Sequence, residues 1–145
     1  MKIAAIDGMG GSIGSQIIRG LRENLPDDLH IIGLGTNAIA ASNMMKAGAN
    51  QGASGENAVS RSVEEADIVI GPISIVVPNS MMGELTTRMA EAIAGAKAQK
   101  ILLPLTNPQI DLVGISKEPL PHLMEEAIEI IRKKMGLPKE VKKDV

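Results

Sequence analysis

Short aliphatic runs that alternate with helical patterns constrain the fold of this chain more than any other feature of its sequence. The runs are continuously apolar rather than alternately polar and apolar, which is typical of parallel strands buried on both faces. The strands predicted in this way are Lys2–Ile6, Ile31–Leu34, Asp67–Ile70, Ile101–Leu105 and an edge strand at Leu112–Ile115, with a minor strand near Ala58 and Val59. Residues 73–77 either extend the strand before them or begin the next connection.

Apolar residues three and four positions apart predict helices between these strands. The predicted helices run from Ile13 to Leu25, Ala38 to Ala47, Leu85 to Ala96 and Leu120 to Met135. For the third helix, Asn79 or Ser80 is the expected N-cap and Glu84 an acidic residue at its start. Because strands and helices alternate, we predict an α/β fold. It is a three-layer, Rossmann-like, doubly wound arrangement whose mostly parallel sheet has about five or six strands.

The composition limits the classes of partner. The 145 residues suffice for one domain, placed at residues 1–136 and followed by a flexible basic tail at 137–145. The net charge of −2 and the absence of Phe, Tyr and Trp argue against a nucleic-acid partner, which needs a basic surface or aromatic stacking. Cys is absent and only two His are present, so thiol chemistry is excluded and no metal site is expected. No apolar run reaches the roughly 20 residues of a membrane span, and we expect a cytoplasmic protein with no membrane partner.

A glycine-rich loop lies between the first predicted strand and the first predicted helix. It reads as G-x-x-G-x-x-G or G-x-G-x-x-x-G, whereas the usual dinucleotide spacing G-x-G-x-x-G would need glycine at Ile13. Such a loop lets backbone N–H groups and the start of the helix approach a phosphate. The alternative is a tight turn without a ligand. The predicted cofactor-binding residues of the loop are Gly8, Met9, Gly10, Gly11, Ser12, Ile13 and Gly14.

Two features differ from an ordinary NAD site. The second predicted strand leads into Thr36 and Asn37, where a carboxylate usually binds the ribose hydroxyls. These side chains either bond to a ribose or leave room for a 2′-phosphate, unless Asn37 simply caps the next helix. Asp7 precedes Gly8, and its charge would repel a pyrophosphate unless a cation or donor intervenes. We expect Asp7 to stiffen the turn by accepting loop N–H groups, and it is also the first candidate catalytic carboxylate.

The remaining candidate residues follow from position. Gly71, Pro72 and Ile73 come after a predicted strand, and Thr106–Pro108 after the next, so both segments are expected at the carboxyl edge of the sheet. We expect Gly71–Ile73 to contact the far end of the ligand, although Gly-Pro and Asn-Pro pairs are also ordinary turn residues. Glu56, in a Gly/Ser/Asn loop, is the second candidate catalytic residue as a general base, or else a surface residue.

Seven stretches between Met1 and about Ile130 carry a resemblance to a known family. They are IDGMGGSIG (Ile6–Gly14), GLGTNAIA (Gly33–Ala40), MKAGAN (Met45–Asn50), GASGENAV (Gly52–Val59), DIVIGPISIV (Asp67–Val76), NSMMGELT (Asn79–Thr86) and KILLPL (Lys100–Leu105). Together they resemble a small bacterial family known only as a domain of unknown function. That resemblance implies a Rossmann-like fold and no particular activity. The glycine loop alone also resembles that of dihydrodipicolinate reductase, an NAD(P)H enzyme.

These observations predict a Rossmann-like domain that binds a nucleotide or dinucleotide, NAD or NADP, through residues 8–14. They leave open whether it catalyses a reaction. The length leaves no room for a separate substrate domain, so we expect a homo-oligomer that completes the crevice and binds a phosphate-bearing small molecule. The alternative is a non-catalytic structural or sensor module, also oligomeric, whose loop binds a small anion or only turns the chain.

Overall fold

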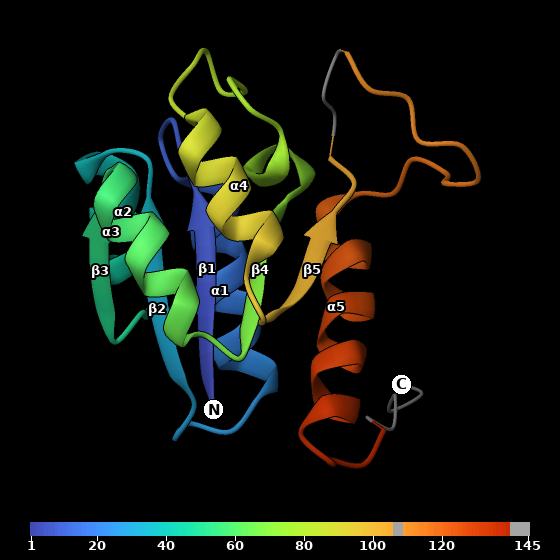
Figure 1. Cartoon of the computed structure of the whole chain (residues 1–145). Helices are drawn as coiled ribbons and strands as arrows, with labels where there is room; N and C mark the ends of the chain where they lie inside the picture. The colour runs from blue at the N-terminus through green and yellow to red at the C-terminus, as the bar shows by residue number, and fades with distance from the viewer. Residues whose placement is uncertain (106–108, 140–145) are drawn as a thin grey trace.

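The computed structural model describes residues 1–105 and 109–139, and within them five strands form one fully parallel sheet. The strand order β3-β2-β1-β4-β5 matches the first five strands of the Rossmann order 3-2-1-4-5-6. This confirms the predicted α/β fold (Figure 1). The strands are β1 (Lys2–Asp7), β2 (His30–Gly35), β3 (Gln51–Ser54), β4 (Ile68–Pro72) and β5 (Gln99–Leu103).

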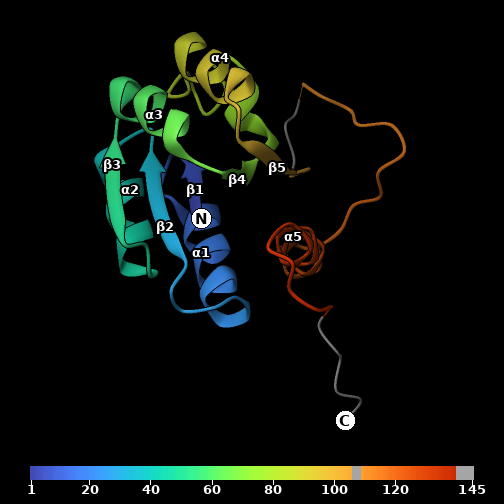
Figure 2. The ribbon, with the colours of Figure 1, turned by 60° about the horizontal axis from the view of Figure 1, so that its bottom comes forward.

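The helices cover both faces of the sheet and make the three layers (Figure 2). Side chains of α1, α2 and α5 pack on one face, while α3, α4 and the short 3-10 turns η1 and η2 pack on the other. The helical elements are α1 (Ser12–Asn24), α2 (Ala38–Lys46), α3 (Glu56–Ser62), η1 (Val63–Glu65), η2 (Ile73–Val76), α4 (Thr87–Gly95) and α5 (Leu120–Lys134).

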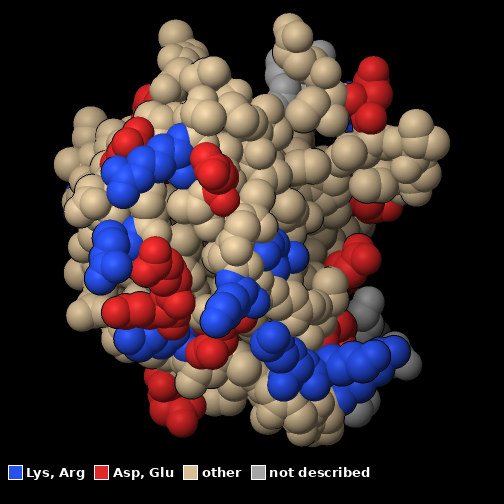
Figure 3. Space-filling model, viewed as in Figure 1, with Lys and Arg blue, Asp and Glu red and all other residues tan. Residues whose placement is uncertain are grey.

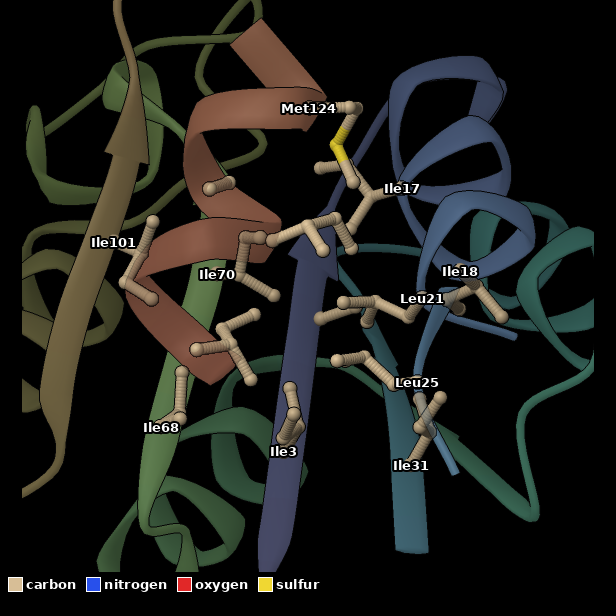
Figure 4. Close-up of a cluster of buried hydrophobic side chains, with 14 of the residues drawn as sticks. Ile3, Ile17, Ile18, Leu21, Leu25, Ile31, Ile68, Ile70, Ile101 and Met124 are labelled. Carbon is tan, nitrogen blue, oxygen red and sulfur yellow. The ribbon is translucent and has the colours of Figure 1, made fainter. Parts of the chain in front are cut away.

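Two aliphatic cores lie between these layers. On the α1 and α5 side, Ile3 and Ile70 of the sheet pack with Ile17 and Leu21 of α1 and with Met124 of α5 (Figure 4). The opposite core joins the alternate sheet residues to α3 and α4. Burying one such aliphatic side chain contributes about 1.5–3 kcal/mol, so the aromatic-free interior is stabilised by many Ile, Leu, Val and Met side chains.

The structure corrects the predicted strands in the weakly patterned segments. The minor strand lies at Gln51–Ser54, and Ala58 and Val59 belong to α3 instead. This strand has little apolar signature because it is an edge strand whose residues are exposed or half-buried. The predicted edge strand at Leu112–Ile115 is not formed, since these residues lie in an exposed connection that turns at Val113 and Gly114.

Two further boundaries differ from the prediction. Residues Ile73–Val76 form η2 rather than an extension of β4. The fourth helix begins at Thr87, and its N-cap is Thr86, whose Oγ1 accepts a hydrogen bond from the Met89 N–H at 3.1 Å. Asn79, Ser80 and Glu84 therefore belong to a separate loop before the helix, which leaves Glu84 free for another role.

The last helix ends as its sequence indicates. Gly136 has a left-handed φ of 72°, and the Leu137 N–H donates to Arg132 O at 2.9 Å, which is the Schellman pattern. The last turn carries Arg132, Lys133 and Lys134, and basic side chains gather where α5 ends in Figure 3. Residues 140–145 of the predicted basic tail lie outside the described residues. No helix in the described part of the chain has the length and apolar character needed to cross a bilayer.

Candidate functional site

The glycine loop joins β1 to α1 at the carboxyl edge of the sheet, between the two strands that flank β1. On one side of β1 lies β2 and on the other β4, so the strand order reverses here and the loop lies at the switch point of the fold. The Gly11 N–H donates to Gly8 O at 2.9 Å and closes the turn. Gly11 itself has a φ of 74°, a left-handed conformation that glycine adopts without strain.

The fourth glycine of the loop allows α1 to pack tightly on the sheet. A Cβ at Gly14 would lie 2.9 Å from Asp7 Cβ and 2.6 Å from Met44 Sδ, both closer than side-chain atoms approach. Glycine at this position therefore permits the close packing of α1 against β1 and α2.

Asp7 is buried directly beneath this loop. Asp7 is only 5% exposed, and its Oδ2 accepts a hydrogen bond from the Gly14 N–H at 2.7 Å. Burial raises the pKa of this carboxyl above 3.8, although hydrogen bonds from the backbone of Gly14, Gly8 and Ile13 oppose the increase. This contact corresponds to the predicted structural role, in which Asp7 accepts a loop N–H.

Thr36 and Asn37 lie beside the loop and form a polar cluster with Glu84. The Asn37 Oδ1 accepts from the Ala40 N–H at 2.9 Å, so Asn37 caps α2. Its Nδ2 also donates to Met9 O at 2.8 Å and to Glu84 Oε1 at 2.6 Å. The Thr36 hydroxyl donates to the same Glu84 oxygen at 2.6 Å. One end of the glycine loop is thus fixed by two residues that follow β2.

The outer side of the loop presents backbone donors to solvent. Within the described residues, the N–H groups of Gly10 and Ser12 donate no hydrogen bond, whereas the Ile13 N–H interacts with the Asp7 carboxyl. Gly10 and Ser12 are exposed, and Asn43 of α2 holds the loop from behind by donating to Gly10 O at 2.8 Å. Two free donors at a helix start can bind an anion, because the helix dipole adds partial positive charge there.

Gly71, Pro72 and Ile73 lie across β1 from Thr36, at the end of β4. A Cβ at Gly71 would lie 2.5 Å from Ile6 O, so the small residue is needed for the close approach of β4 to β1. Gly71 and Pro72 are buried, and Ile73 is half-buried as it begins η2. These residues share the carboxyl edge with the glycine loop, as expected, whereas Thr106–Pro108 lie outside the described residues.

Glu56 lies on a different element from the rest of the candidate residues. It is the first residue of α3, not part of a long loop, and its Oε1 lies 3.5 Å from Arg88 Nη1 of α4. This exposed ion pair joins two helices that cover the sheet. Glu56 forms no hydrogen bond or ion pair with the glycine loop among the described residues. Its role as a general base stays a prediction.

Sequence reasoning missed Glu84, Asn43 and Met81 as residues of this site. A Cβ at Gly8 would lie 2.6 Å from Met81 Sδ, so this side chain covers the first glycine. The one available sequence signal was Gly83, since glycine often marks a residue with a positive φ. In the structure Gly83 has a φ of 87°, and Asn79, Met81 and Met82 of the same loop also have positive φ values.

The glycine loop is exposed at Met9, Gly10 and Ser12. A groove of about 1290 Å³ lies between α1 and α5, and a second of about 570 Å³ lies beside β5 and α5. No residue of the glycine loop lines either groove. On the face in Figure 3, acidic and basic side chains are intermixed, with no extended basic area over the sheet.

The chain is similar to one protein family and to solved structures of α/β proteins. The family model described as Domain of unknown function (DUF3842) matches residues 2–136, which confirms the resemblance seen in the sequence. A comparison with curated proteins gives no match. The solved structure of a dodecameric FMN-dependent Ubix-like decarboxylase from Escherichia coli O157:H7 is similar, with a TM-score of 0.50, 15% identity, and coverage of 100% of this chain and 98% of that one. An NAD⁺ complex of an imine reductase V8 variant from Myxococcus stipitatus gives a TM-score of 0.42, 15% identity, and coverage of 94% and 38%.

Proposed function

The chain belongs to the family described as Domain of unknown function (DUF3842), and we propose that it binds a nucleotide or an NAD(P)-type dinucleotide through its glycine loop. The observation that carries the proposal is the pair of free N–H groups at Gly10 and Ser12, at the switch point of a Rossmann-type sheet. Ligands of doubly wound folds bind in that position because helix N-termini and loop amides converge there.

The residues around the loop fit the parts of such a ligand. The amides of Gly10 and Ser12 would hold phosphate oxygens. Thr36 and Asn37 lie on the ribose side, and the end of β4 at Gly71–Ile73 faces the far end of a dinucleotide. The described surface at the loop offers no Lys or Arg side chain bonded to it, so recognition of the phosphate would rest on amides and the dipole of α1.

The similar solved decarboxylase is FMN-dependent and dodecameric. We extend both properties to this chain as proposals, namely a nucleotide-type cofactor and a homo-oligomeric state. A site on an open edge of a single domain becomes enclosed when a second subunit covers it, which fits the oligomer expected from the chain length. Asp7 and Glu56 remain the candidate catalytic carboxylates.

A different observation favours a non-catalytic structural or sensor module. Two carboxylates of the chain already bind amides of the loop, since Asp7 accepts from Gly14 and Glu84 Oε1 lies 3.3 Å from the Met9 N–H. Under this alternative the loop only turns the chain or binds a small anion.

Urea denaturation with and without ligand separates the two functions. Saturation at 100 times the dissociation constant adds about 2.7 kcal/mol to the free energy of unfolding. We expect this increase with NAD⁺, NADPH or ATP, and none with adenosine, which has the base and ribose but no phosphate. Stabilisation by inorganic phosphate alone would support the small-anion module, and no stabilisation by any of these compounds would contradict nucleotide binding.

A further inference from the structure

The second strand lacks the acidic residue that doubly wound nucleotide-binding domains usually carry at its end. After β2 the chain continues with Thr36 and Asn37. Both side chains nevertheless donate to one carboxylate oxygen, Glu84 Oε1, at 2.6 Å each. A carboxylate from a loop nearly fifty residues further along the chain therefore lies where the usual acidic residue would be.

The charge of this carboxylate is stabilised and one of its oxygens stays available. Hydrogen bonds from Thr36 and Asn37 lower the pKa of Glu84 below 4.5, so the group is ionised at neutral pH. All of its hydrogen bonds within the described residues, including the long contact from the Met9 N–H, go to Oε1. The half-exposed side chain leaves Oε2 free to accept hydroxyl hydrogens.

The loop that carries Glu84 is anchored on both sides of it. Leu85 is fully buried in the core against α4, and its N–H donates to Ser80 O at 3.2 Å. The Asn79 N–H donates to Leu85 O at 2.8 Å, and the Ser80 hydroxyl donates to Ser74 O at 2.6 Å. Glu84 is therefore held in place before any ligand arrives, as recognition residues generally are.

We propose that Glu84 is the ribose-recognition residue of the cofactor site and selects nucleotides with free ribose hydroxyls over those with a 2′-phosphate. The inference rests on the nucleotide-binding function proposed above. Two vicinal hydroxyls can donate to Oε2, whereas a 2′-phosphate would bring like charge against the carboxylate. Glu84 forms no ion pair with a Lys or Arg of the described residues, so nothing there offsets that repulsion.

Calorimetric titration of the whole chain with ADP-ribose and with its 2′-phosphate tests the inference. We expect the wild type to bind ADP-ribose at least about tenfold more tightly than the 2′-phosphate, because a charge-assisted hydrogen bond is replaced by repulsion. In Glu84→Gln this ratio should fall to about one, since the amide oxygen still accepts from Thr36 and Asn37 but carries no charge. The matched control Glu23→Gln removes the same charge at the far end of α1, at the opposite edge of the sheet, and should keep the ratio.

The outcomes distinguish this inference from the function on which it rests. Equal or tighter binding of the 2′-phosphate by the wild type would overturn the role of Glu84, and so would tighter ADP-ribose binding by Glu84→Gln, because the carboxylate would then be a competitor of the ligand. If inorganic pyrophosphate binds and ADP-ribose does not, the phosphate site stands and the ribose inference fails. If none of the three compounds binds, the proposed function fails with it.

A measurement on the wild type alone covers the case in which Glu84→Gln does not fold. 2′-Deoxy-ADP-ribose lacks one of the two hydroxyl donors and adds no charge. We expect it to bind about five- to tenfold more weakly than ADP-ribose, as for the loss of one hydrogen bond to a charged group. Equal affinities would contradict a carboxylate that accepts both hydroxyls.

Discussion

The inner and outer sides of the glycine loop are built for different purposes. On the inner side, a Cβ at Gly11 would lie 2.8 Å from Ala40 Cα, one at Gly14 would contact Asp7, and one at Gly8 would overlap Thr36. On the outer side, a Cβ at Gly10 would have no neighbour within 4 Å, and the adjacent Ser12 is exposed. Only the outer side has space for a ligand.

This difference separates two reasons for glycine within one motif. The inner glycines are required by the fold, whether or not a nucleotide binds. The fold does not require glycine at position 10. The missing side chain there instead leaves the outer surface of the loop open to a ligand. A substitution of Gly10 can therefore distinguish a nucleotide-binding loop from a simple turn.

The largest effect is expected from filling the inner side. Gly11→Ala places a Cβ against the backbone of Ala40 in a residue with a φ of 74°. A left-handed conformation costs a non-glycine residue about 1–2 kcal/mol, and the overlap adds to it, so we expect a loss of about 3 kcal/mol or more in unfolding free energy. Urea denaturation measures this loss, and a loss below about 1 kcal/mol would contradict the packing of the inner side.

A smaller effect is expected from loosening the contact between α2 and the loop. Asn37→Ala removes the N-cap of α2 and the two donations from Nδ2 to Met9 O and Glu84. Loss of an N-cap costs about 0.5–2 kcal/mol, and we expect a total near the upper end of this range by urea denaturation. Asn37→Asp keeps the capping oxygen but places a second carboxylate against Glu84. The loss of unfolding free energy caused by Asn37→Asp should therefore be smaller in a protein that also carries Glu84→Gln.

The fold was predictable because its signals are local and periodic. The core strands β1, β2, β4 and β5 are apolar runs, and α1 and α5 bury one face each. The edge strand β3 was misplaced because its pairing with β2 leaves its residues exposed or half-buried, and polar residues such as Gln51 carry no strand period.

The site was predictable only where the loop is continuous in sequence. Asp7 and Asn37 were identified because they adjoin the loop or the end of β2. Glu84 was assigned to a helix start, since its contact with Thr36 spans 48 positions and depends on the path of the loop before α4. No spacing rule in a single sequence reveals a contact of that kind.

The pH dependence of stability tests whether Asp7 is buried on the inner side of the loop. Because burial raises the pKa of Asp7 in the folded state, the native protein binds a proton more tightly than the unfolded chain does. Its contribution to stability is therefore largest below the unfolded value of 3.8 and is lost as the pH rises through the folded pKa.

Asp7→Asn removes this titration and still offers an oxygen to the Gly14 N–H. We expect the unfolding free energy of the variant minus that of the wild type to increase as the pH rises from below 3.8 through the raised pKa of folded Asp7. Urea denaturation across this range measures the difference. Parallel curves for the two proteins would show that Asp7 titrates alike in both states and is not buried as described.

The smallest effect on stability and the clearest effect on binding are expected at Gly10. Gly10→Val has open space around its Cβ and should change the unfolding free energy by no more than about 0.5 kcal/mol. If phosphate oxygens bind the amides of Gly10 and Ser12, the branched side chain obstructs them, and the nucleotide-induced stabilisation of about 2.7 kcal/mol should disappear at the same ligand concentration. Gly95→Val is the matched control, because Gly95 also has no neighbour within 4 Å of a Cβ and lies at the end of α4 toward the other edge of the sheet. Undiminished stabilisation of Gly10→Val by nucleotide would place the ligand elsewhere and leave the outer side of the loop without a function.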